Sequence, residues 1–308
     1  MRVFVTGATG FIGSAIVPEL IAGGHTVLGL TRSDAGAASL VAAGAEVHRG
    51  SLEDLQALRA GAAASDGVIH TAYNHDWSIT REVASETDRE AVEAIAGALG
   101  GSGKPFVVTS GTLMVALPAA GRTATEEDAS ENAALPRVAS EIAVQAAAAL
   151  GVRASVVRLA PTVHGAGDHG FVPTLIGIAR RSGVSAFVGD GANRWPAVHR
   201  LDAAGLFRLA LEKGAPGARF HGAAEEGVPM RAIADAIGQG LGIPVRSIAP
   251  GKAQGHFDWL APFVVMDNPT SSAITRKSLG WRPREAELLT DLRDGGYFSD
   301  VNTLVARG

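Results

Sequence analysis

Residues 2–13 decide the fold, and they read Arg2-Val3-Phe4-Val5-Thr6-Gly7-Ala8-Thr9-Gly10-Phe11-Ile12-Gly13. A β-branched, apolar segment runs directly into three glycines, and the following stretch, Ser14–Gly23, carries apolar residues at helical spacing. Between a strand and a helix, such glycines predict a phosphate-binding loop. One allows the tight turn, one lets the backbone approach a pyrophosphate, and one lets the helix pack on the strand. An ordinary strand-to-helix turn is the alternative.

The helix N-terminus after this loop should face the anion, so the ligand is expected to be a dinucleotide. The loop residues that we expect to contact it are Gly7, Thr9, Gly10, Phe11, Ile12 and Gly13.

Short β-branched runs alternate with Ala- and Leu-rich helical stretches over the first part of the chain, which is typical of parallel strands joined by crossover helices. The expected strands are Arg2–Thr6, Thr26–Thr31, Glu46–Arg49, Gly67–Thr71, Pro105–Thr109 and Ala154–Leu159. The expected helices are Ser14–Gly23, Ala35–Ala43, Leu52–Ala60 and Arg81–Gly100. The pattern predicts an α/β fold, a Rossmann-type doubly wound parallel sheet.

After about Thr162 the alternation becomes less regular, with Gly, Pro and Asp clusters at 165–170, 189–196 and 244–255. We therefore expect a dinucleotide-binding domain over residues 1–161, joined by later segments around 190–225. Residues 162–308 should form mainly a smaller, substrate-covering region.

The end of the second expected strand indicates which dinucleotide fits. An acidic residue there would bind the ribose hydroxyls of NAD, but this strand ends Thr31-Arg32-Ser33. An arginine between two hydroxyls suits a 2′-phosphate, so NADP(H) is predicted and NAD(H) is the less favoured cofactor. In the alternative, Arg32 is a solvated surface residue and Asp34 binds the ribose.

Composition excludes several classes of function. The 308 residues are 46% hydrophobic and 19% charged, and no uninterrupted apolar run is long enough to cross a membrane. The absence of cysteine excludes disulfides and thiolate chemistry. A net charge of −4 without a basic run argues against nucleic acid. We expect a cytoplasmic protein with a small-molecule substrate and no membrane or nucleic-acid partner, and a homodimer is left open. His199 and Asp202 are too few for a metal site, so no metal is expected.

Several further segments resemble the extended branch of the short-chain dehydrogenase/reductase superfamily, which includes nucleotide-sugar epimerases and dehydratases, dihydroflavonol reductases and hydroxysteroid dehydrogenases. They are residues 50–54, similar to the segment that meets the adenine although Ser51 replaces the usual Asp, and residues 66–72, 107–112, 158–165, 198–202 and 279–283. The resemblance implies additional cofactor contacts from Ser51, Leu52, Thr71, Ala72, Thr109, Pro161, Thr162 and Val163.

The catalytic residues of that superfamily are only partly present. Its members use a Ser or Thr that polarises a carbonyl and a Tyr-x-x-x-Lys pair in which the ammonium lowers the pKa of the phenol. The resemblance places the hydroxyl at Ser110, with Thr112 as the nearest substitute. Where the pair is expected, this chain has Arg137 and Glu141. These two either form an i,i+4 ion pair or bind the cofactor or the substrate.

A replacement proton donor is expected after the strand that ends near residue 71, where the chain reads Tyr73-Asn74-His75-Asp76. Tyr73 is the best-placed acid, His75 titrates near neutrality, and Asp76 could orient either. His164 and His169 flank the glycine-rich segment that should border the nicotinamide, and His164 is a candidate substrate or cofactor contact. For each aromatic or histidine residue, ordinary packing is the alternative.

The sequence therefore predicts an NADP(H)-dependent oxidoreductase with an atypical active site, acting on a carbonyl or related unsaturated bond of a small organic substrate. There are two alternatives: a protein that binds the dinucleotide without turnover, and a non-redox lyase or isomerase.

Overall fold

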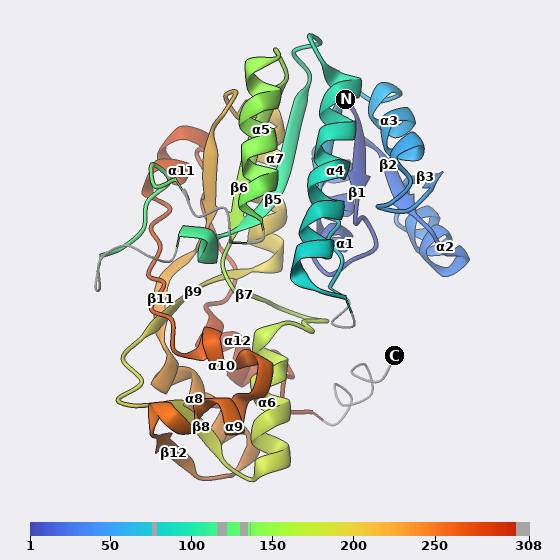
Figure 1. The fold of residues 1–308 in the computed structure, drawn as a ribbon. Helices are drawn as coiled ribbons and strands as arrows, with labels where there is room; N and C mark the ends of the chain where they lie inside the picture. Colours follow the sequence, from blue (N-terminus) through green and yellow to red (C-terminus); the bar gives the residue numbers. More distant parts are fainter. Residues whose placement is uncertain (76–78, 116–121, 130–134, 136, 300–308) are drawn as a thin grey trace.

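The computed structural model describes residues 1–75, 79–115, 122–129, 135 and 137–299, and its centre is a seven-stranded parallel sheet (Figure 1). The strand order is β10-β6-β5-β4-β1-β2-β3, and every neighbouring pair is parallel. The strands are β1 (Arg2–Thr6), β2 (Thr26–Thr31), β3 (Glu46–Arg49), β4 (Gly67–His70), β5 (Pro105–Gly111), β6 (Arg153–Leu159) and β10 (Arg219–Gly222). The predicted Rossmann-type fold is confirmed. The order reverses beside β1, where such sheets bind ligands at their carboxyl edge.

Helices cover both faces of this sheet (Figure 1). One face packs against α1 (Gly13–Ala22) and α7 (Arg200–Lys213), and the other against α3 (Leu55–Ala63), α4 (Arg81–Leu99) and α5 (Val138–Ala149). The short α2 (Asp34–Ala42) joins β2 to β3. Because both faces are covered, the inner strands such as β1 and β5 are mostly apolar.

One helix begins later than the sequence pattern indicates. The expected helix from Leu52 begins at Leu55 instead, because the Asp54 side chain caps it by accepting a hydrogen bond from the Ala57 amide at 2.9 Å. Leu52 is thereby left in the loop that follows β3. The strand β5 continues two residues beyond Thr109, so Ser110 lies inside the sheet.

A smaller part lies next to the carboxyl edge of the large sheet (Figure 1). It has a three-stranded sheet of β7 (Thr162–His164), β9 (Arg194–His199) and β11 (Glu225–Pro229), and a two-stranded sheet of β8 (Ser185–Val188) and β12 (Val245–Ile248). Its helices are α6 (Phe171–Ser182), α8 (Met230–Leu241), α9 (Ala253–Phe257), α10 (Ala261–Val264) and α12 (Leu288–Asp294), while α11 (Ala273–Leu279) packs near β10. A separate apolar core fills this part.

Among the residues described, no helix has the length and apolar character to span a membrane. The same residues contain no group of three or more His, Cys, Asp or Glu side chains arranged to hold a metal ion.

Candidate functional site

In the glycine loop between β1 and α1, Gly10 is less crowded than Gly7 and Gly13. Gly7 has φ 67°, and a Cβ at Gly13 would lie 2.0 Å from the Gly7 carbonyl oxygen, so both glycines are required by the fold itself. A Cβ at Gly10 would meet only that same oxygen, at 3.2 Å. Gly10 and Thr9 are exposed. The open backbone at Gly10, ahead of the α1 N-terminus, is therefore the place where an anion can approach.

The end of β2 presents one uncommitted charge. Arg32 is exposed, whereas Thr31 is buried and Ser33 caps α2 by accepting from the Gly36 amide at 3.0 Å. Asp34, the alternative ribose ligand, has its carboxylate 2.6 Å from Arg49. Arg32 and Asp34 are both exposed at this strand end, but within the described residues only Asp34 has a charged partner, in a salt bridge on the surface.

Four polar side chains reach the carboxyl edge of the sheet on the face covered by α4 and α5. They are Thr6, His70, Ser110 and Arg158, and each lies two residues after a core side chain of that face. Since side chains alternate along a strand, all four point towards α4 and α5.

Ser110 is 2% exposed, and its hydroxyl makes no hydrogen bond within the described part of the chain. Its neighbours are committed to the structure: Thr109 donates to the His70 carbonyl at 2.9 Å, and Thr112 donates to Asn268 Oδ1 at 2.8 Å. An unpaired buried hydroxyl costs free energy unless a ligand meets it. Of the three hydroxyls, Ser110 is therefore the one available to a bound molecule.

Glu141 does not pair with Arg137, so the i,i+4 ion pair considered above is wrong. Its two carboxylate oxygens accept from Arg158 Nε at 2.9 Å and Nη2 at 2.6 Å, and Arg158 is fully buried. Arg158 Nη1 also donates to the Asp128 carbonyl at 2.7 Å. Glu141, at the position where the superfamily carries lysine, is therefore bound by the buried Arg158 of β6.

Arg137 lies at the N-cap of α5, and its guanidinium carbon is 4.0 Å from the centre of the Tyr73 ring. The same guanidinium is 3.8 Å from Asp88 Oδ1. Tyr73 in turn lies edge to face with His75, with ring centres 5.0 Å apart, and its hydroxyl is 3.3 Å from Ser85 Oγ. Two predicted residues, Tyr73 and Arg137, are thus stacked on each other.

A buried chain of hydrogen bonds leads to Asp88, the carboxylate next to Arg137. Thr6 Oγ1 is 2.8 Å from His70 Nδ1, and His70 Nε2 is 3.2 Å from Asp88 Oδ1. Ser140 of α5 donates to Asp88 Oδ2 at 2.6 Å. Burial acts to raise the pKa of Asp88, but the charge of Arg137 and the bonds from His70 and Ser140 outweigh it and hold that pKa below its usual range. Asp88 is therefore a buried carboxylate, which the sequence pattern did not reveal.

His75 is a neutral imidazole at physiological pH. Desolvation by the surrounding protein, followed by the charges of Arg137 and His169, lowers the pKa of His75 to about 4, although the residue is exposed by surface area. The expectation that it titrates near neutrality is wrong. His169 also contacts the glycine loop, with its ring 5.6 Å from that of Phe11. Asp76 lies outside the described residues.

The loop after β7 is held by the C-terminal part of the chain. His164 is buried and bonded to Asp291 at 2.7 Å, and Tyr297 donates to Asp168 at 2.8 Å. Burial raises the pKa of Asp168 to about 6. Nearby, the predicted contact Thr162 is buried and donates to the Pro196 carbonyl at 2.5 Å. The side chains of His164 and Thr162 therefore hold the structure together.

Arg200, which the sequence pattern did not single out as a ligand contact, covers the glycine loop. Its guanidinium carbon lies 4.8 Å from the Phe11 ring centre, and Nη2 donates to Ser14 Oγ in the first turn of α1 at 2.9 Å. Gly165 leaves room for it, since a Cβ there would lie 3.0 Å from Arg200 Cγ. A cation from α7 therefore lies at the N-terminal end of α1.

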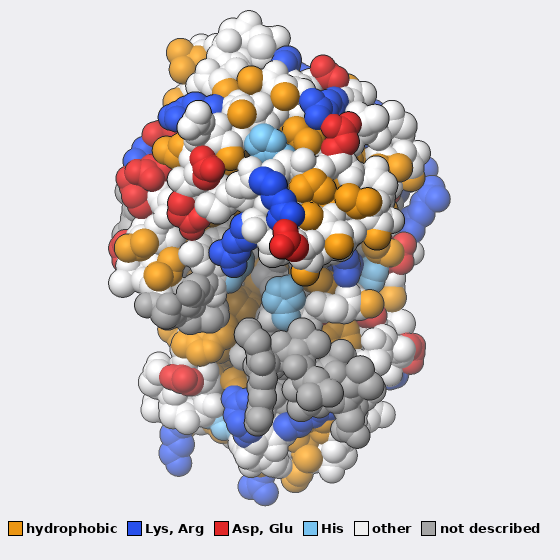
Figure 2. All heavy atoms as spheres, turned by 90° about the vertical axis from the view of Figure 1, so that its right-hand side faces the viewer, with side chains coloured by type: hydrophobic (Ala, Val, Ile, Leu, Met, Phe, Trp, Pro, Cys, Tyr) orange, Lys and Arg blue, Asp and Glu red, His pale blue; other side chains and the backbone are white. Residues whose placement is uncertain are grey.

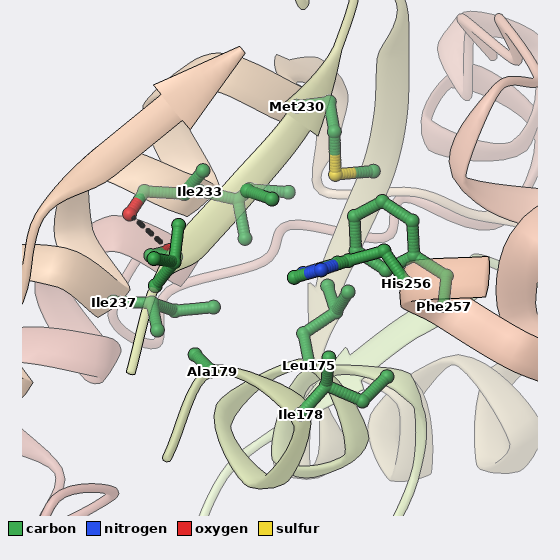
Figure 3. Close-up of a pocket in the computed structure, with 12 residues that line it drawn as sticks. Leu175, Ile178, Ala179, Met230, Ile233, Ile237, His256 and Phe257 are labelled. Atoms are coloured by element: carbon green, nitrogen blue, oxygen red, sulfur yellow. Dashed lines mark hydrogen bonds between the residues drawn. The ribbon is translucent and has the colours of Figure 1, made fainter. Parts of the chain in front are cut away.

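The hollow between the large-sheet part and the smaller part is visible in Figure 2, with His side chains on its walls. It is distinct from the small cavity of Figure 3, which lies between α6 and α8 and is lined by residues such as Leu175, Ile233 and Phe257. That cavity has a volume of about 10 Å³, the space of about one water molecule. The cavity of Figure 3 is too small for an organic substrate.

Comparisons with known proteins agree with this arrangement. The family model described as "NAD dependent epimerase/dehydratase family" matches residues 3–221. The chain is 50% identical to an uncharacterized protein of Schizosaccharomyces pombe, over 97% of this chain and 100% of the relative. It is 30% identical to a 2-alkyl-3-oxoalkanoate reductase of Stenotrophomonas maltophilia, over 79% of this chain and 77% of the relative. A dTDP-glucose 4,6-dehydratase of Streptomyces venezuelae, solved with NAD bound, has a similar fold with a TM-score of 0.77, 22% identity and 98% of each chain covered.

Proposed function

Because the chain belongs to the NAD dependent epimerase/dehydratase family, we propose that it is an NADP(H)-dependent oxidoreductase that reduces a carbonyl or related unsaturated bond of a small organic substrate. The observation that carries the proposal is the buried, unpaired hydroxyl of Ser110 at the carboxyl edge of the sheet. A reductase needs a hydrogen-bond donor at this edge to meet the oxygen on which charge develops. The S. maltophilia relative, named as a reductase of an oxoalkanoate, supports the same reaction class.

The residues of the cofactor site fit a dinucleotide. Gly10 leaves the backbone open for the pyrophosphate, and Arg200 adds a positive charge beside the α1 N-terminus. Arg32 is exposed and has no charged partner in the part of the chain that the structure describes, while the exposed Asp34 pairs with Arg49 on the surface; the free arginine favours a 2′-phosphate over free ribose hydroxyls and hence NADP(H) over NAD(H). In this proposal residues 1–161 and the later segments around 190–225 hold the cofactor, and residues 162–308 mainly cover the substrate.

The chain's own residues supply orientation and a proton. The reduced nicotinamide provides the hydride when it is bound. Ser110 donates a hydrogen bond to the acceptor oxygen. Ser85 donates its own proton to the Arg81 carbonyl at 2.7 Å, so the Tyr73 hydroxyl points its proton towards Ser85 Oγ across a long 3.3 Å contact. A proton held this weakly is available to a substrate, and with His75 neutral, Tyr73 is the proton donor that we propose.

A dinucleotide-binding protein without turnover is the second candidate. It is favoured by the commitment of Glu141 to Arg158, which leaves no counterpart of the superfamily's lysine at that position. In that case the cofactor site remains and the chemistry is lost.

Binding and turnover separate the two candidates. NADPH fluorescence on mixing with the protein measures binding, and NADPH oxidation against a panel of aldehydes, ketones and imines measures turnover. Ser110→Ala should lower turnover tenfold or more at unchanged NADPH affinity. Ser155→Ala is the matched control, because Ser155 is another buried, unpaired hydroxyl on the neighbouring strand β6 and lies away from the carboxyl edge.

Tyr73→Phe tests the proton donor, since it keeps the ring beneath Arg137 and removes only the hydroxyl. Turnover should fall while NADPH affinity is unchanged. Tight NADPH binding without oxidation in the presence of any panel member would refute the oxidoreductase and favour the second candidate.

A further inference from the structure

Arg137 is a nearly covered cation without a hydrogen bond. Its side chain is 15% exposed, yet none of its guanidinium donors makes a hydrogen bond to the residues that the structure describes, and Nε is fully buried. Burying the Nε–H without an acceptor costs free energy, and the four Nη–H donors also have no hydrogen-bond partner among the described residues. This cost indicates that the group is arranged for an acceptor that comes from outside the chain.

Other covered arginines in the described chain make hydrogen bonds, although Nε of Arg2 and Nε of Arg200 are also buried without a partner. Arg158 bonds to Glu141 and to the Asp128 carbonyl, and Arg153 donates to the Gly214 and Leu211 carbonyls at 3.0 and 2.9 Å. Burial alone therefore does not explain the state of Arg137, because the same fold provides acceptors for arginines that serve structure only.

Asp88 is the nearest candidate partner, and it does not saturate Arg137. The closest distance between the two groups is 3.8 Å, beyond hydrogen-bonding range, and the carboxylate already accepts from Ser140 and His70. Asp88 therefore offsets the charge of Arg137 without accepting a hydrogen bond from it. A cation held in this way keeps its fork for a ligand.

The surroundings of Arg137 are those of the candidate site. Its guanidinium is stacked on Tyr73, and it begins α5, the helix towards which the unpaired Ser110 points. We propose that Arg137 binds a carboxylate of the substrate, so that the substrate is a small carbonyl compound bearing a carboxylic acid. This inference rests on the proposed function, with Ser110 at the carbonyl and Arg137 at the acid.

Repulsion by Asp88 disfavours a carboxylate less than a phosphate, because a carboxylate brings one negative charge and a dianionic phosphate brings two. One guanidinium with a buried carboxylate 3.8 Å away matches a single planar, singly charged anion. A dianionic phosphate would be repelled by Asp88, and His75, neutral because its pKa is lowered to about 4, adds no positive charge.

The test uses three keto acids, 3-oxobutanoate, 4-oxopentanoate and 5-oxohexanoate, each beside its methyl ester, binding to the protein saturated with NADP⁺. Calorimetry should show at least one acid binding tenfold or more tighter than its ester, the size of effect expected when a charge-assisted hydrogen bond is lost. Arg137→Gln should abolish this difference. Arg137→Lys should retain part of it, because lysine keeps the charge and loses the fork, and it serves if the glutamine variant fails to fold.

Arg59→Gln is the matched control, since Arg59 is exposed on α3 and the charge change is the same; it should keep the full preference for the acid. NADPH affinity should be equal in all the variants. Equal affinity of the wild-type protein for acids and esters, or an undiminished preference in Arg137→Gln, would overturn the inference.

The two proposals fail in different ways. If ketones without a carboxylate are reduced in a Ser110-dependent manner and acids gain nothing, the reductase stands and the acid site falls. If acids bind through Arg137 and no NADPH is oxidised, the acid site stands and the reductase falls.

Discussion

Replacing Glu141 by Gln should destabilise the protein strongly without weakening cofactor binding. The substitution leaves Arg158 fully buried with its charge uncompensated, and breaking a buried pair from one side costs about 3–5 kcal/mol. Arg158 keeps its 2.7 Å bond to the Asp128 carbonyl, so we expect the lower end, about 3 kcal/mol. With about 2.1 cal/mol/K of unfolding entropy per residue over 308 residues, that loss lowers Tm by about 5 °C.

Equilibrium unfolding in guanidinium chloride measures the loss, and an NADPH titration of the folded variant measures binding. The double variant Glu141→Leu with Arg158→Met removes both charges and should recover much of the stability. A change in unfolding free energy below about 0.5 kcal/mol together with weakened ligand binding would refute the structural role and place Glu141 in the site.

Three further predictions concern the cofactor site and His75. Arg32→Ala should lower the affinity for NADPH roughly tenfold or more and leave the affinity for NADH nearly unchanged. Arg200→Ala should lower both affinities alike, because both cofactors contain the pyrophosphate. Titration with each cofactor measures these affinities, and equal losses in Arg32→Ala would contradict the NADP assignment. Gly10→Val should abolish dinucleotide binding in calorimetry. A Cβ there would lie 3.2 Å from the Gly7 carbonyl oxygen, so the loop must shift slightly, and the circular dichroism spectrum should show that the fold is kept. A folded variant that still binds would mean that the loop is only a turn. The pKa of His75 is lowered from its usual 6.5 to about 4 in the folded protein. As the pH drops from about 6.5 to about 4, the unfolded chain therefore binds a proton at His75 before the folded chain does, and the free energy of unfolding falls. His75→Gln should show a smaller fall between pH 7 and 5 in urea unfolding, and an unchanged fall would count against that pKa.

Much of the large sheet was predictable because its signals are local. The first three strands begin and end where the β-branched runs do, and the glycine loop lies at the predicted junction of β1 and α1. Helix α3 was placed three residues too early because the cap by Asp54 overrides the apolar pattern from Leu52. The position of Ser110 at the carboxyl edge also followed from its strand, since consecutive parallel strands end at the same edge.

The sequence by itself determined the parallel sheet and its glycine loop, because strand period, helix period and glycine's conformational freedom act between near neighbours. Only the tertiary structure decided what Arg137 and Glu141 do. Their spacing of four residues suggested a mutual ion pair, but Arg158 on β6 takes Glu141, and Tyr73 and Asp88 from distant segments surround Arg137. Partners of buried charges come from whichever strands and helices pack together, and that packing is settled by the whole core and not by spacing along the chain.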